Sequence, residues 1–279
     1  MEYTLYITNK NYSSWSLRPW LLMRQLGLPF KEVMRPLTPG SYRQPQWKEF
    51  SPVAHVPCLH ITSPPSPPSP GSSPREPEEA IVLWESLAIV DYLAEAFPGL
   101  PIYPPLAMGP APTPTVPSVQ SRARRAWARS AVAEMHAGFS ALRGEMGMCV
   151  GLRVQLEAQP SPGLLADLAR IDELWTEGLM RWGGPFLAGP QFGAVDAFYA
   201  PVALRLQTYV GSERYLSERA RQYAEMIRGL EGVREWVAAA VKETLREPVH
   251  DKEIVEGVGG VERVVLEDLR AAAAVTTAD

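Results

Sequence analysis

Two kinds of hydrophobic spacing divide this chain. In the first hundred residues, short apolar or alternating runs predict four β-strands, over residues 3–8, 30–35, 55–61 and 81–84. Apolar residues at helical spacing predict helices over 16–26 and 87–97, and Gly27 ends the first of them as a C-terminal cap. The order β-α-β, a short helical turn, then β-β-α predicts an α/β domain over residues 1–97.

From residue 118 onward the apolar spacing is that of helices. Predicted helices cover residues 118–148, 161–182, 196–210, 217–228 and 233–246. They predict an all-α domain over residues 118–248. Residues 249–279 are polar or alanine-rich, and no element is predicted there.

Proline, with 28 residues in the chain, gathers in two segments. Residues 62–79 are mainly proline, serine, glycine and glutamate, which predicts a solvated insertion between two strands. Residues 98–117 separate the α/β half from the helical half and are predicted to be a linker.

Composition and charge exclude several function classes. Hydrophobic residues make up 46% and charged residues 21%, as in ordinary globular proteins. The net charge of −4 offers no general attraction to nucleic acid or to an anionic membrane, so the arginines at 122, 124, 125 and 129 are expected on a solvated or interdomain face. No signal peptide or membrane span is expected. Two separated cysteines and four scattered histidines predict a reducing, cytoplasmic location and no metal site.

Three short motifs stand at the ends of predicted elements. Residues 11–20, Asn-Tyr-Ser-Ser-Trp-Ser-Leu-Arg-Pro-Trp, open the first helix. Residues 51–57, Ser-Pro-Val-Ala-His-Val-Pro, lead into the third strand, and residues 84–89, Trp-Glu-Ser-Leu-Ala-Ile, follow the fourth. In this order and spacing the chain resembles the glutathione transferases, and the paired serines are similar to those of the serine-type zeta and theta classes.

The resemblance implies a thioredoxin-like N-terminal domain that binds glutathione and an all-α C-terminal domain. It also implies that a serine at the start of the first helix stabilises the glutathione thiolate, for which Ser14 is the first choice and Ser13 the second. A hydroxyl there donates a hydrogen bond to the sulfur, and the helix dipole favours the anion. A serine in this position can instead simply cap the helix.

The other site residues also come from the resemblance. Val56 and Pro57 would form a cis peptide that presents backbone to glutathione, although Pro57 can simply begin a strand. Glu85 and Ser86 would bind the γ-glutamyl group, although a helix cap explains them nearly as well. His55 lies at the glycyl end and is better explained as a surface residue. Candidates for the second-substrate pocket, some of which are expected to be core, are Tyr12, Trp15, His136, Phe139 and Arg143.

Three functions follow from this resemblance. The first is a glutathione S-transferase that attacks a small hydrophobic electrophile. The second is a zeta-like, glutathione-dependent cis–trans isomerase, in which the adduct rotates about a bond and releases glutathione. The third is a non-catalytic assembly module that has lost glutathione binding. The family resemblance further implies a homodimer. It also implies that Asp196, three residues after Gly193, belongs to a capping element with a folding role.

Overall fold

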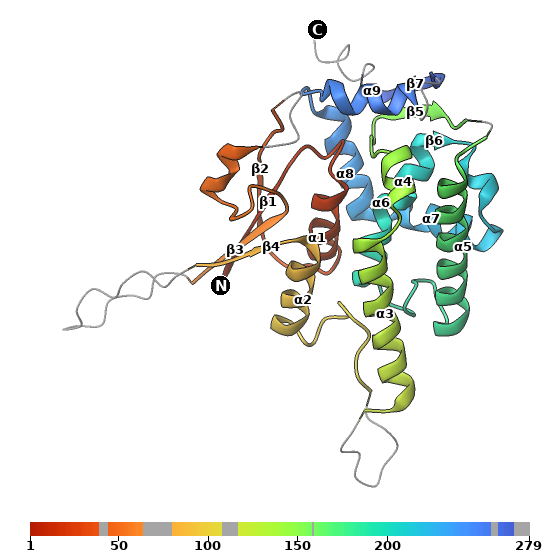
Figure 1. The fold of residues 1–279 in the computed structure, drawn as a ribbon. Helices are drawn as coiled ribbons and strands as arrows, with labels where there is room; N and C mark the ends of the chain where they lie inside the picture. The colour runs from red at the N-terminus through yellow and green to blue at the C-terminus, as the bar shows by residue number, and fades with distance from the viewer. Residues whose placement is uncertain (39–43, 64–79, 108–116, 158, 258–261, 271–279) are drawn as a thin grey trace.

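The computed structural model describes residues 1–38, 44–63, 80–107, 117–157, 159–257 and 262–270. It has two halves, a mixed sheet with two helices and a bundle of longer helices (Figure 1). The predicted insertion over 62–79 lies outside the described residues except for its first two positions. Of the predicted linker, 98–107 and 117 are described.

The N-terminal half is built on a four-stranded sheet in the order β2-β1-β3-β4. Its strands are β1 (Glu2–Ile7), β2 (Lys31–Met34), β3 (Cys58–Thr62) and β4 (Ile81–Trp84). β1 runs parallel to β2, with Thr4 opposite Lys31, and antiparallel to β3. A βαβ unit followed by a β-hairpin is the thioredoxin-like arrangement, so the predicted fold of this half is confirmed.

Two helices accompany this sheet. They are α1 (Ser14–Gln25) and α2 (Ser86–Ala96), and a 3₁₀ turn, η1 (Pro45–Glu49), lies between β2 and β3. α1 is buried on nearly all sides because it lies between the sheet and the second half. The Arg18 guanidinium, for example, stacks 4.8 Å from the ring of Phe198 in the helical domain. α1 therefore joins the two halves.

The C-terminal half is mainly helical, as predicted, but one predicted helix is divided in two. Its helices are α3 (Val119–Ala137), α4 (Ser140–Glu145), α5 (Pro162–Trp182), α6 (Ala194–Thr208), α7 (Glu218–Gly229), α8 (Glu231–Lys242) and α9 (Pro248–Glu256). The single helix predicted over 118–148 is wrong, because the chain breaks between α3 and α4. There Gly138 is extended and Phe139 adopts a left-handed conformation with φ of 57°.

A small three-stranded sheet was not predicted. It has the order β6-β5-β7, formed by β5 (Leu152–Gln155), β6 (Tyr209–Val210) and β7 (Val265–Asp268), and a second 3₁₀ turn, η2 (Ser212–Tyr215), follows β6. With α9 it gives structure to much of the C-terminal segment, and Figure 1 shows both at the top of the molecule. The predicted domain boundary at 248 therefore falls where α9 begins, and the segment beyond it packs back onto the body.

The start of α6 is a fully satisfied helix cap. Asp196 is completely buried and accepts hydrogen bonds from the backbone N–H groups of Gly193 and Leu187, at 3.0 Å each, and from the Tyr223 hydroxyl, at 2.9 Å. A Cβ on Gly193 would lie 2.8 Å from the Pro101 carbonyl oxygen, so only glycine fits beside the linker. The predicted folding role of Asp196 is confirmed.

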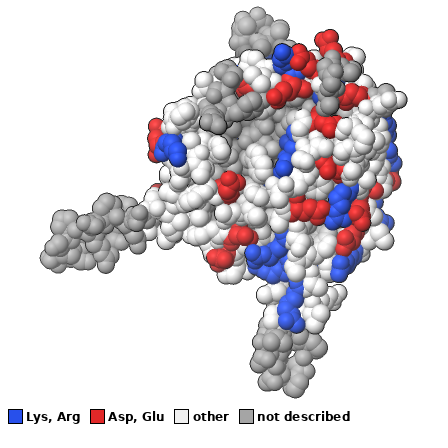
Figure 2. Space-filling model, in the orientation of Figure 1, with Lys and Arg blue, Asp and Glu red and all other residues white. Residues whose placement is uncertain are grey.

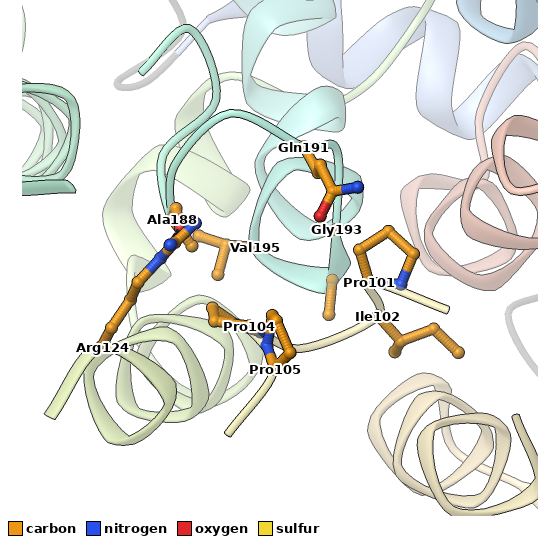
Figure 3. A pocket seen from close by; sticks show the side chains of 10 residues that line it. Pro101, Ile102, Pro104, Pro105, Arg124, Ala188, Gln191, Gly193 and Val195 are labelled. Atoms are coloured by element: carbon orange, nitrogen blue, oxygen red, sulfur yellow. Dashed lines mark hydrogen bonds between the residues drawn. The ribbon is translucent and has the colours of Figure 1, made fainter. Parts of the chain in front are cut away.

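The linker is held on the helical half by Arg125 of α3, which donates to the Pro104 carbonyl at 3.1 Å. Arg124, one residue before it, donates from Nε to the Ala188 carbonyl within the helical half. Figure 3 shows the crevice between Pro104, Pro105 and the start of α6, with Arg124 at its edge. With about 10 Å³ of space it has room for no more than a water molecule. This face of α3 is therefore interdomain, as expected from the charge.

The described helices include none that is both long and apolar enough to cross a membrane. On the face drawn in Figure 2, basic and acidic side chains are interspersed over the helical half. The two cysteines, Cys58 and Cys149, are free thiols and are buried.

Candidate functional site

A cleft of about 470 Å³ lies between the two halves of the molecule. Its volume falls in the usual range for a small-molecule site. Figure 2 shows a hollow near the centre of the molecule, where the two halves meet. Seven of the residues predicted from the motifs line the cleft: Tyr12, Ser13, Trp15, His55, Val56, Pro57 and Glu85.

The two serines at the start of α1 point to different places. Ser13 is partly exposed and lines the cleft. Ser14 is 6% exposed, does not line the cleft, and its Oγ accepts a hydrogen bond from Nη2 of the buried Arg205 at 3.3 Å. The structure therefore places Ser13 on the cleft, whereas a partner from α6 holds the Ser14 hydroxyl away from it.

Ser13 is the N-terminal cap of α1 and also has a hydroxyl neighbour. Its Oγ accepts from the backbone N–H of Ser16 at 3.2 Å and donates to the Ser16 Oγ at 2.8 Å. Ser16 is fully buried, and its Oγ also accepts from the Thr8 N–H at 3.3 Å. The Ser13 proton is therefore engaged by Ser16, and a ligand on the cleft that takes this proton replaces one hydrogen bond.

Val56 and Pro57 are joined by a cis peptide bond at the edge of the cleft, as the resemblance implied. The described residues form no hydrogen bond with the backbone of Val56. His55 also lines the cleft but is exposed, and its backbone N–H donates to the Ser51 Oγ at 3.3 Å. The free backbone at Val56 can pair with an extended peptide as a further strand would.

The start of α2 borders the cleft through Glu85, and Ser86 lies directly behind it without lining the cleft. Ser86 is fully buried, and its Oγ has no hydrogen-bond partner among the described residues. No side chain caps the helix. Glu85, directly before it, has φ of 68° and ψ of 126°, a conformation that is strained for any residue with a side chain. An open helix N-terminus with a spare hydroxyl is suited to a carboxylate.

Tyr12 contributes its ring to the cleft, but its hydroxyl is occupied. The hydroxyl lies 3.0 Å from Oδ1 of Asp251, and it accepts from the Glu247 backbone N–H at 3.2 Å and from Nη1 of Arg270 at 2.8 Å. Burial raises the pKa of the Tyr12 phenol above its usual range. A tyrosine has one proton to donate, and here Asp251 takes it, so Tyr12 is not available to stabilise a sulfur anion.

The residues predicted for the second substrate separate into two groups. Trp15 lines the cleft, and partly buried His136 and Arg143 lie against it, with the His136 and Trp15 ring centroids 5.4 Å apart. Phe139 is 6% exposed and packs on the Tyr199 ring inside the helical domain. Phe139 therefore belongs to the core, and its predicted place in the pocket is wrong.

Four cleft residues were missed by the sequence analysis: Thr8, Leu37, Trp47 and His250. Three of them belong to the sheet domain, where adjacency to the motifs was the only signal. His250 comes from α9, and its ring lies 5.4 Å from that of Tyr12. Nothing in the local sequence indicated that the C-terminal segment returns to the cleft. In the part of the chain that is described, no group of three His, Cys, Asp or Glu side chains could hold a metal ion.

Comparison with known proteins agrees with this geometry. Residues 12–96 match the family described as "Glutathione S-transferase, N-terminal domain". No curated protein is similar to the chain in sequence. Among solved structures, glutathione transferase Omega 2S from Trametes versicolor superposes with a TM-score of 0.54 at 20% identity, covering 90% of this chain and 95% of that one.

Two further structures are similar. A glutathione transferase homolog from Burkholderia GL BGR1, with bound glutathione, has a TM-score of 0.50 at 18% identity and covers 86% of this chain and 98% of its own. FzlA from C. crescentus has a TM-score of 0.55 at 18% identity, over 85% and 92%. The comparisons do not confirm the zeta or theta class suggested by the paired serines. The chain has the glutathione-transferase fold, and its residues 12–96 are similar to the N-terminal domain of the glutathione S-transferases.

Proposed function

We propose that the cleft binds glutathione and that the Ser13 hydroxyl holds its thiolate for attack on a small electrophile. The observation that carries the proposal is that Ser13 is on the cleft, at the N-terminus of α1, and donates its proton in a single bond to Ser16 that a ligand sulfur can replace. A free thiol with a pKa near about 8.5 is largely protonated at neutral pH. A donated hydrogen bond and the helix N-terminus both favour the thiolate, which is the nucleophile.

The rest of the tripeptide matches the open groups around Ser13. The unpaired backbone of Val56 suits the cysteinyl backbone, and His55 lies on the same side of the cleft. The open start of α2, with the unpartnered Ser86 hydroxyl, suits the γ-glutamyl carboxylate, and Glu85 suits its ammonium group. Both charged groups of the γ-glutamyl end of glutathione, the carboxylate and the ammonium, thus find suitable partners at the start of α2.

The alternatives differ in the product rather than in the activation of the thiol. A transferase releases the thioether, whereas a zeta-like isomerase releases unchanged glutathione and an isomerised olefin. A non-catalytic assembly module would have no glutathione affinity; the likeness to FzlA, whose name describes no transferase, keeps it as the third candidate. A cytoplasmic location and a homodimer are also part of the proposal. Sedimentation tests the homodimer.

Calorimetry with reduced glutathione, followed by mass spectrometry of the product formed with a conjugated enone, tests the function. We expect binding at or below about 1 mM and a product that requires Ser13. Ser13→Ala is compared with Ser14→Ala, since the two serines are adjacent and only one is on the cleft. Absence of binding at millimolar glutathione would contradict the transferase and the isomerase together.

A further inference from the structure

Three arginines from three different helices meet behind Trp15. The Arg18 guanidinium of α1 lies 4.2 Å from the Trp15 ring centroid, and that of Arg143 of α4 lies 5.5 Å from it. Arg205 of α6 binds Ser14, one residue away, and also donates to the carbonyl oxygens of Arg143 and Met146. Three positive charges are thus concentrated beside one wall of the cleft.

No carboxylate neutralises this cluster. Arg18 is 1% exposed and Arg205 is 5% exposed, yet neither they nor Arg143 form an ion pair with any described residue. Burial and the neighbouring arginines lower the pKa of Arg18 to about 9, and burial lowers that of Arg205 to about 10. Both remain protonated at neutral pH. Unpaired buried charge is unfavourable, so a compensating group is expected.

Two other buried arginines of this chain show the usual arrangement. Arg270, 4% exposed, binds both Asp251 and Asp268, and Arg263, also 4% exposed, binds Glu157. By contrast, several donors of the Trp15 cluster have no partner within the described chain: Arg18 Nε and Nη1, Arg205 Nε and His136 Nδ1. Among the buried arginines of the described chain, those beside the cleft wall therefore differ from the others in having no acidic partner.

The cluster lies directly behind the part of the cleft wall that Trp15 forms, and its own residues do not line the cleft. Arg143 and His136 are only partly buried, and both contact Trp15, which lines the cleft together with Ser13. Arg143 uses Nη1 on the carbonyl oxygens of Met135 and His136, and the described residues leave its Nε and Nη2 without a hydrogen bond. Those two atoms form the side of the guanidinium that can bind a carboxylate with two parallel hydrogen bonds.

We infer that the second substrate is an anion, whose carboxylate binds Arg143 and His136 beside Trp15 while Arg18 and Arg205 supply the positive field behind them. This departs from the neutral hydrophobic electrophile that the resemblance suggested. Its role in catalysis rests on the proposed function, but the anion site itself does not. Glu85 is the one acid that acts electrostatically on His136, and bound glutathione would engage it through its ammonium group.

Binding of an unreactive pair of ligands tests the site without any chemistry. The protein is titrated with 3,5-dinitrobenzoate and with its neutral methyl ester, with and without glutathione, and tryptophan fluorescence is followed. We expect the carboxylate to bind about tenfold more tightly than the ester, and Arg143→Gln and His136→Gln each to reduce that preference severalfold. Added salt should weaken binding of the carboxylate and leave binding of the ester unchanged.

Arg122→Gln is the matched control, since it removes one charge from an exposed position of α3 and should preserve the preference. Arg143 also binds carbonyl groups at the end of α3, so each variant is checked by thermal unfolding, and His136→Gln provides a second test if Arg143→Gln is unstable. Equal affinities for acid and ester, or a preference that survives both cleft variants, would overturn the inference. That result would leave glutathione binding by the calorimetric test intact, whereas failure of glutathione to bind would leave the carboxylate preference measurable.

Discussion

The starts of α2 and α6 are two helix N-termini that each hold a fully buried polar side chain and differ in which groups satisfy it. At α6, Asp196 accepts three hydrogen bonds from its own chain and is fully buried. At α2, Ser86 is equally buried, yet its hydroxyl has no partner, and Glu85 before it has a strained backbone. A helix start that the protein completes serves folding, whereas one left incomplete beside a cleft is prepared for a ligand.

The largest expected effect is a loss of stability when the cap at the start of α6 is removed. Asp196→Ala leaves two backbone N–H groups and the Tyr223 hydroxyl without an acceptor, so we expect it to lower the free energy of unfolding by about 3 kcal/mol. Urea unfolding measures this. Asp172→Ala, which removes the acceptor of one backbone N–H at Ser217, is the control and should cost about 1 kcal/mol. Equal losses for the two variants would contradict the distinction.

Ser13 and Ser14 extend the comparison to the start of α1. Ser13→Ala should lower turnover with glutathione by about tenfold or more, because a donor to the developing thiolate is lost. Ser14→Ala should retain most of the turnover but lose about 1 kcal/mol of stability, because Arg205 loses an acceptor. Steady-state kinetics and thermal unfolding separate the two effects, and the reverse pattern would restore Ser14 as the functional serine.

Removing the open hydroxyl at α2 should affect the ligand and leave folding unchanged. Ser86→Ala is expected to weaken glutathione binding about fivefold to tenfold while changing the unfolding free energy by less than about 0.5 kcal/mol. Calorimetry and denaturant unfolding on the same preparation measure both quantities. A loss of stability with unchanged affinity would mean that α2 begins with an ordinary cap.

Replacing Glu85 should have the smallest effect on glutathione affinity, and it should change stability in the opposite direction to the other variants. Glu85→Gly relieves a backbone conformation with φ of 68° and should stabilise the fold by about 1 kcal/mol. Since the same change removes the partner for the glutathione ammonium group, affinity should fall by a few fold, as for an exposed ion pair. Glu85→Gln, which keeps the strain and loses the charge, separates the two contributions. A destabilised Glu85→Gly variant would contradict the assignment of strain to this position.

The sequence was sufficient for features that depend on neighbouring residues. The strand at Ile81–Trp84 was predicted at the residues where it is found, and α5, which begins after the Ser161 cap, within one residue, since apolar spacing and capping are local signals. The cap formed by Asp196 was predicted from the resemblance to the family's capping element. The reason for glycine at 193 was not, because the Pro101 carbonyl that excludes a side chain lies far away in sequence.

Features that depend on distant partners could not be predicted. Ser13 and Ser14 are equivalent in sequence, and only Arg205, some 190 positions later, decides which one faces the cleft. The segment after residue 248 has no strong pattern, and it is fixed against Tyr12 by Arg270 and Asp251. The break after α3 depends on a left-handed Phe139, a conformation that side-chain type does not indicate.

The most direct test of the central claim is a titration of the thiol of bound glutathione, followed by the ultraviolet absorbance of the thiolate in wild type and in Ser13→Ala. The account predicts that the wild-type complex titrates at least about one pH unit below the ordinary thiol value near 8.5. In the Ser13→Ala complex the value should return most of the way to that of free thiol, whereas Ser14→Ala should resemble wild type. A thiol pKa that is equally low with and without the Ser13 hydroxyl would contradict the account.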